Sequence, residues 1–185
     1  YQFKRFTKVS SGEESTILEG EYYPGIGRDS VDMYLMDPFL WSDPLAMTSM
    51  ARTMLDWLIQ TYPDDKAIFE ANFTALEIEM VRLQADFQLL QNVPQPLKLV
   101  TMTPSFGNWQ RSYGIHIYPV GLSKFGVLPN ESQLNIIRER IIQDGVGYIV
   151  HEEGMPEEYE ALFNQLKVEL ELEVIELSNL YTLSD

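Results

Sequence analysis

Residues 97–120 read LKLVTMTPSFGNWQRSYGIHIYPV, and this stretch decides the fold. Residues 97–101 form a short apolar run that predicts a strand, and residues 105–113 predict a short helix that ends at Gly114. Residues 115–120 then predict a second strand. A strand, a helix and a strand in this order favour parallel pairing, because parallel neighbours need a crossover connection.

The same alternation continues toward the end of the chain. Helices are predicted over residues 131–143 and 156–169, and strands over residues 147–151 and 172–177. The predicted fold class is therefore α/β, with a lobe built of parallel βαβ units. In such sheets ligands gather at the carboxyl ends of the strands. Here those ends fall at residues 101–105, 120–124, 151–154 and 177–180.

A long helix is predicted over residues 64–91, upstream of the lobe, with a length of roughly 40 Å. Its apolar side chains recur at alternating spacings of four and three, as Phe69, Phe73, Leu76, Met80, Leu83, Phe87 and Leu90. The stripe indicates either a dimerising coiled coil or a helix packed on its own domain. We favour the second interpretation, because three aromatic rings crowd a two-stranded seam.

A shorter helix is predicted to precede it, beginning after the capping signal Ser42-Asp43-Pro44 and ending before Pro63. The chain then divides into residues 1–40, which are irregular, a connecting helical segment at residues 41–93, and the carboxyl α/β lobe at residues 94–185. Residues 1–40 carry too little pattern to fold alone.

Composition excludes several classes of function. The formal net charge is −15, and a field of that sign repels nucleic acid. Cysteine is absent, which excludes disulfides and thiolate metal ligands. No apolar run approaches the ~20 residues of a transmembrane helix. We therefore predict no nucleic-acid partner and no transmembrane segment in this chain.

Catalytic motifs are also absent, since the sequence shows no nucleophile with a matching base, so we do not expect an enzyme. One cluster remains, His151-Glu152-Glu153 at the end of a predicted strand. It is a weak candidate for a divalent cation. The alternative is a structural carboxylate that binds backbone N–H groups of a neighbouring loop.

Several segments resemble the cluster A-I metal-binding lipoproteins, the solute-binding components of zinc and manganese ABC transporters. Residues 36–44, MDPFLWSDP, resemble the D-P-H-x-W-x-x-P segment of that family. Residues 100–109, VTMTPSFGNW, resemble its V-T-S-H/E-x-x-F-x-Y-F segment. Tyr113-Gly114, residues 129–134, residues 149–152 and residues 173–180 follow further family segments in the same order.

The resemblance implies a two-lobed, periplasmic-binding-protein-like fold in which a rigid helix joins the lobes. Residues 1–40 would then be a remnant of the amino lobe and a loop, with most of that lobe absent. It also implies an extracytoplasmic location, a lipid anchor on the full-length protein, an ABC transporter permease as partner, and zinc or manganese as the bound metal.

The ligand positions depart from the family pattern. Phe39 stands where the family has the histidine of D-P-H, Thr103 where it has histidine or glutamate, and Ser178 where it has the final aspartate. A phenyl ring and two neutral hydroxyls are poor ligands for zinc or manganese. The remaining cleft lining implied by the resemblance is Trp41, Phe106 and Trp109. We expect a solute-binding component with a degenerate metal site, or alternatively an extracytoplasmic interaction or adhesion module that kept the fold and lost the ligand.

Overall fold

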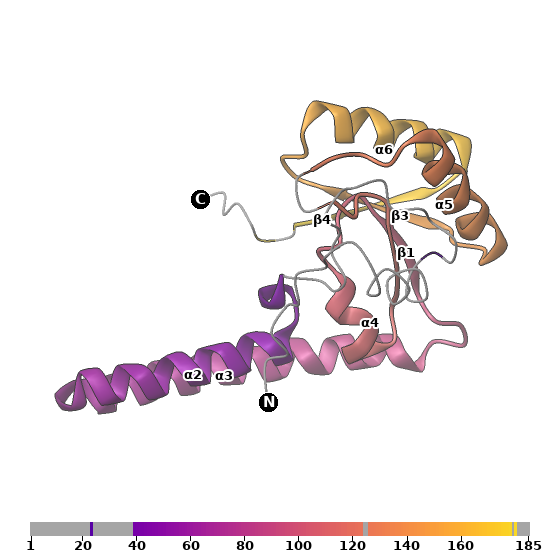
Figure 1. Ribbon diagram of the computed structural model, residues 1–185. Helices are drawn as coiled ribbons and strands as arrows, with labels where there is room; N and C mark the ends of the chain where they lie inside the picture. The colour runs from indigo at the N-terminus through magenta and orange to yellow at the C-terminus, as the bar shows by residue number, and fades with distance from the viewer. Residues whose placement is uncertain (1–22, 24–38, 124–125, 179, 181–185) are drawn as a thin grey trace, which may run out of the picture.

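The computed structural model describes Tyr23, residues 39–123, residues 126–178 and Leu180. Figure 1 shows an α/β lobe from which a long helical hairpin extends. The predicted segments in residues 1–22 and 24–38 lie outside the described residues.

The lobe is built on a four-stranded sheet in which every pairing is parallel. Its strands are β1 (Lys98–Thr101), β2 (His116–Pro119), β3 (Tyr148–Glu152) and β4 (Glu173–Leu177), in the order β2-β1-β3-β4. Leu99 of β1 stands opposite Ile117 on one side and Tyr148 on the other. The predicted parallel α/β lobe is confirmed.

Three helices connect these strands: α4 (Gly107–Tyr113), α5 (Glu131–Gln143) and α6 (Glu157–Glu169). Helix α4 ends at Gly114, whose φ of 70° lies in the left-handed region that glycine adopts without strain. Helix α5 begins at a capping box, in which the Asn130 side chain accepts from Gln133 N and the Gln133 side chain accepts from Asn130 N.

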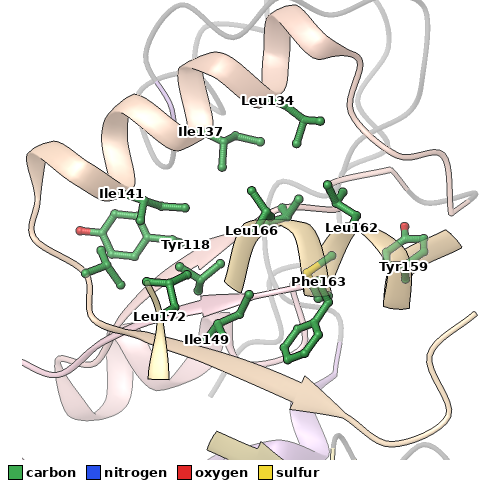
Figure 2. Packing of buried hydrophobic residues seen from close by; sticks show 14 of the residues in the cluster. Tyr118, Leu134, Ile137, Ile141, Ile149, Tyr159, Leu162, Phe163, Leu166 and Leu172 are labelled. Carbon is green, nitrogen blue, oxygen red and sulfur yellow. The ribbon is translucent and has the colours of Figure 1, made fainter. Parts of the chain in front are cut away.

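Helices α5 and α6 cover one face of the sheet, and α4 lies on the other face, toward the hairpin (Figure 1). A hydrophobic core lies on each face of the sheet, and alternate strand residues point to opposite faces. Val100 and Ile149 belong to the larger core, whereas Leu99 and Val150 belong to the smaller one. Figure 2 shows side chains of α5 and α6 meeting in the larger core, among them Leu134, Ile137, Ile141, Leu162 and Leu166.

The hairpin consists of α2 (Pro44–Thr61) and α3 (Lys66–Leu89), joined by the short 3₁₀ turn η2 (Pro63–Asp65). Two further 3₁₀ turns flank it, η1 (Leu40–Ser42) and η3 (Leu90–Asn92). The predicted apolar stripe is partly covered along most of α3. Five of its members are half-buried: Phe69, Phe73, Leu76, Met80 and Phe87. Leu83 and Leu90 are exposed at 43% and 40%.

Among the described residues, helix α3 contacts the lobe at its carboxyl end, so the predicted packing of this helix on its own domain is seen there. There the Phe87 ring stacks on Tyr113 with centroids 4.7 Å apart. No residue from 45 to 89 is buried, because α2 is the main neighbour of α3. Large apolar side chains therefore stay exposed on the hairpin, including Met54, Trp57, Ile68, Ile78 and Val81. The division of the chain at residues 40 and 93 stays a prediction.

Candidate functional site

A pocket of about 240 Å³ lies at the carboxyl ends of β1, β2 and β3. This is the edge of a parallel sheet at which ligands bind. The loop after each strand contributes to the wall, and α6 and the segment before α2 complete it. The lining residues are Phe39, Thr103, Pro104, Gly121, Ser123, Gly126, Glu152, Glu153, Gly154, Met155, Pro156 and Tyr159.

Glu152 is the last residue of β3, and its side chain is 1% exposed. Its Oε1 accepts hydrogen bonds from Thr103 N at 3.2 Å and from Thr103 Oγ1 at 3.0 Å, and its Oε2 lies 2.9 Å from the same hydroxyl. The Thr103 hydroxyl also contacts Ser105 Oγ. The carboxylate therefore holds the loop after β1 against the end of β3, as one of the two sequence-based interpretations of Glu152 predicts.

Gly121 is required by a close approach of backbone to backbone. A Cβ atom at this position would lie 2.7 Å from Met102 O and 2.9 Å from Tyr159 Oη. Gly121 N donates to Met102 O at 3.0 Å, so the loop after β2 is bonded to the loop after β1. This contact brings the walls of the pocket together.

Phe39 is positioned by a network at the beginning of α2. Ser42 Oγ lies 2.8 Å from Phe39 O and 3.0 Å from Ser105 O, and Trp109 Nε1 donates to Ser42 O at 2.8 Å. The Phe39 ring meets the half-buried Trp41 ring edge-on, with centroids 5.2 Å apart. These bonds fix Phe39 against the loop that carries Thr103.

Asp43 is the centre of the same network and is fully buried. It caps α2 by accepting from Leu45 N at 2.9 Å, and it also accepts from Ser112 Oγ at 2.5 Å and Tyr113 OH at 3.2 Å. Burial and the neighbouring carboxylate raise the pKa of Tyr113, so its hydroxyl stays protonated and donates. The cap thereby joins the hairpin to α4.

The structure brings together two of the three substituted ligand positions. Phe39 and Thr103 both line the pocket. Ser178 follows β4, is exposed, and accepts from Leu180 N at 3.1 Å, so it does not reach the pocket lining. The assignment of these three positions to a ligand site stays a prediction.

The three aromatics predicted to line the family cleft are not in the lining of this pocket, and their assignment to the cleft stays a prediction. Phe106 and Trp109 are 1% and 8% exposed and pack in the smaller core, with ring centroids 4.7 Å apart. Neither belongs to the pocket lining, and Trp41 reaches it only through its contact with Phe39. The physical reason is that α4 turns its apolar face toward the sheet, which draws both rings inward.

The side chains of His151, Glu152 and Glu153 do not converge on one point. Glu152 and Glu153 line the pocket, whereas His151 Nδ1 lies 2.6 Å from Glu176 Oε2 and His151 Nε2 lies 2.8 Å from Glu160 Oε1. The hydrogen bond to Glu176, followed by that to Glu160, raises the pKa of His151. Within the described ranges, no group of three or more His, Asp or Glu side chains is arranged for a metal ion.

Sequence reasoning missed Met155 and Tyr159 as pocket residues, whereas Gly121 and Ser123 lie in the strand end at residues 120–124 where ligands were expected. A signal existed for Gly121, because it directly follows an apolar strand at the edge where ligands bind. No local signal connects Thr103 with Glu152, since they lie 49 positions apart.

This architecture has counterparts among solved structures. ZnuA matches at 23% identity and a TM-score of 0.67, over 80% of this chain and 54% of that one. The laminin-binding protein Lbp of Streptococcus pyogenes matches at 19% identity and a TM-score of 0.72, over 80% and 57%. A zinc-bound mutant variant of AdcAII from Streptococcus pneumoniae matches at 21% identity and a TM-score of 0.71, over 89% and 59%.

These likenesses show that the chain shares the fold of these proteins, and it spans little more than half the length of each. The sequence model of the family described as zinc-uptake complex component A, periplasmic, matches residues 4–185. The chain belongs to this ZnuA family, which is extracytoplasmic and non-enzymatic. The resemblance stated from the sequence is thus confirmed.

Two negative findings complete the comparison. No curated protein sequence matches the chain. Across the residues with a described structure, no helix is both long and apolar enough to cross a membrane.

Proposed function

We propose that this chain is the extracytoplasmic solute-binding component of an ABC transporter, with a family metal site that has lost its ligands. Phe39, Thr103 and Ser178 fill the positions at which the family holds zinc or manganese. The proposed partner is the transporter permease, and a lipid anchor would hold the full-length protein at the membrane surface.

The observation that carries this proposal is the pairing of Thr103 with Glu152. The hydroxyl at the family's ligand position donates to a buried carboxylate at 3.0 Å and 2.9 Å. A neutral hydroxyl is a poor ligand for zinc or manganese beside imidazole and carboxylate, and the Phe39 ring offers no lone pair. Two neighbouring ligand positions are therefore occupied by groups that do not coordinate these metals.

Metal analysis of the purified chain tests the proposal. After dialysis against trace-metal-free buffer, mass spectrometry should find zinc and manganese far below one equivalent per chain. The variant His151→Gln serves as control, because it removes one of the two imidazoles outside the pocket, the one that lies beside two carboxylates and could collect zinc adventitiously. One equivalent of either metal, retained by His151→Gln and removed by a chelator, would contradict the proposal.

The second candidate function is a non-transport interaction or adhesion module. The observation that favours it is the exposed apolar surface of the α2–α3 hairpin, which includes Trp57, Ile78 and Val81. Lbp, one of the similar structures, is described as laminin-binding. Saturable binding of the chain to immobilised laminin, weakened by Trp57→Ser and absent on albumin, would support this function. Equal binding signals on laminin and albumin would contradict this second function.

A further inference from the structure

Methionines gather on one helix of the hairpin. Helix α2 carries Met47, Met50 and Met54, three of the eight methionines of the chain. Their spacings of three and four residues place all three along one face of the helix, with neighbouring Cβ atoms about 5–6 Å apart. Methionine side chains on a helix lean toward its amino end, so Met54 leans over the turn of Met50 and Met50 over the turn of Met47. The three thioethers therefore follow one another in a row along α2.

Helix α3 brings a fourth methionine level with this row. Arg52 of α2 contacts Glu77, and its guanidinium carbon lies 4.7 Å from the centroid of the Phe73 ring, so it stands across from the stretch between those two residues. The two helices run in opposite directions (Figure 1), so five residues back along α2 correspond to about five residues forward along α3. This register sets Met47 level with Met80, a half-buried member of the apolar stripe.

Hydrophobic packing does not account for the whole row. Met54 is 63% exposed, and Met47 and Met50 are half-buried. None of the three belongs to either core of the lobe. A methionine in a core stabilises the fold by filling space, whereas an exposed one presents its polarisable sulfur to solvent. The row is therefore accessible to an ion.

The kind of ion follows from the donor atoms. A neutral thioether is a soft ligand that suits Cu(I), whereas zinc in proteins takes charged thiolate, imidazole or carboxylate ligands. The chain has no cysteine, so methionine is its only source of sulfur. The formal net charge of −15 favours the approach of a cation.

We propose that the α2–α3 hairpin binds a soft monovalent metal ion, Cu(I), through the thioethers of Met47, Met50 and Met54, with Met80 beside them on α3. This site is separate from the pocket at the carboxyl ends of the strands. The inference goes beyond the proposed function, because it does not depend on the loss of the family metal site.

Calorimetric titration with Ag(I), an air-stable ion of the same charge and a similar softness, tests this inference in chloride-free buffer. We expect saturable binding of one equivalent per chain. Cu(I) kept reduced under argon should displace Ag(I) from the chain, and an equal concentration of zinc should not. The absence of saturable Ag(I) binding would overturn the inference, and so would displacement of Ag(I) by zinc.

Variants locate the bound ion. Met50→Leu and Met54→Leu keep apolar volume but remove the sulfur, and each should weaken Ag(I) binding about tenfold or more. Met155→Leu makes the same change in the pocket and should leave the affinity for Ag(I) unchanged. His116→Gln and His151→Gln remove the two imidazoles of the chain, and should also leave this affinity unchanged.

The exposed position of Met54 keeps the test decisive even where Met50→Leu fails to fold, because exposed apolar exchanges of equal volume rarely disturb a fold. Unchanged Ag(I) affinity in Met54→Leu would overturn the inference. Loss of Ag(I) binding in His116→Gln or His151→Gln would place the ion at an imidazole and overturn it as well. Zinc titration of the pocket is a separate measurement, so the failure of either proposal leaves the other in place.

Discussion

Single residues at the pocket set how closely its walls approach each other. Gly121 has no room for a side chain, because an added Cβ would lie 2.7 Å from Met102 O. Thr103 and Glu152 then join the loop after β1 to the end of β3. The site is thus built by short contacts between residues that are distant in sequence.

Gly121→Ala should destabilise the fold by about 1–3 kcal/mol, because backbone or Tyr159 must shift to admit the methyl group. Urea unfolding measures this change. Gly147→Ala is the matched control, since a Cβ there meets nothing within 4 Å. Gly147→Ala should be neutral or stabilising by up to ~1 kcal/mol. Equal unfolding midpoints for the two variants would contradict the steric account of Gly121.

The His151 ion pairs predict a pH dependence of stability. Bonds to Glu176 and Glu160 raise the pKa of His151 above its ordinary value of 6.5. A group with a higher pKa in the folded chain than in the unfolded chain stabilises the fold when protonated. The contribution is complete below pH of about 6.5 and is lost as pH rises through the raised value.

Urea midpoints of the wild type should therefore fall as pH rises above the unfolded pKa of His151, near ~6.5. His151→Asn should flatten this dependence, because it removes the titrating ring. Glu176→Gln removes one of the two acceptors and should flatten it in part. A variant with the full slope of the wild type would show that other groups cause the dependence.

At the scale of elements, the residue that caps α2 stabilises more than its own helix. Asp43 accepts from Leu45 N and also from Ser112 and Tyr113 of α4. Asp43 therefore helps attach the hairpin to the lobe, together with the bonds of Ser42 and the contact of Phe87 with α4.

Asp43→Ala should cost about 2–4 kcal/mol, because it removes a cap and leaves the hydroxyls of half-buried Ser112 and buried Tyr113 without their acceptor. Asn130→Ala, which removes the cap of α5, should cost about 1 kcal/mol. Thermal and urea unfolding of the two variants give the comparison. Equal costs would show that Asp43 acts only as a helix cap.

Sequence patterns predicted most of these elements, since strand runs, capping signals and helix breakers are local. The helix over residues 131–143 and the cap at Asp43 follow from such signals. The pairing of Thr103 with Glu152 did not follow from local signals, because it depends on β3 lying beside β1, and no local pattern encodes that neighbourhood. The inward packing of Phe106 and Trp109 was not predicted for a similar reason, since the direction of the short helix α4 decides which rings turn inward.

At the scale of the whole molecule, stability is unevenly distributed. The sheet carries both cores, whereas no residue from 45 to 89 is buried. The burial of α2 and α3 depends on what packs against them. The apolar stripe in the sequence does not predict how many of its side chains the lobe covers. The chain spans 54% of ZnuA and 57% of Lbp.

Amide hydrogen exchange should reveal this asymmetry. Amides in the distal hairpin, residues 54–78, should exchange through local openings of lower free energy than those of β1 and β3. The strands should exchange only with global unfolding, and destabilisation by Gly121→Ala should accelerate them. Equal protection of the hairpin and the strands would contradict the difference in burial between these two parts.

The central claim is that a family metal site has lost its ligands at Phe39 and Thr103. Calorimetric titration of the chelator-treated chain with zinc tests it most directly, with His151→Gln measured in parallel. The account predicts no saturable one-to-one binding in His151→Gln and at most a weak, imidazole-dependent signal in the wild type. Tight one-to-one binding of zinc that survives His151→Gln and disappears in Glu152→Gln would contradict it.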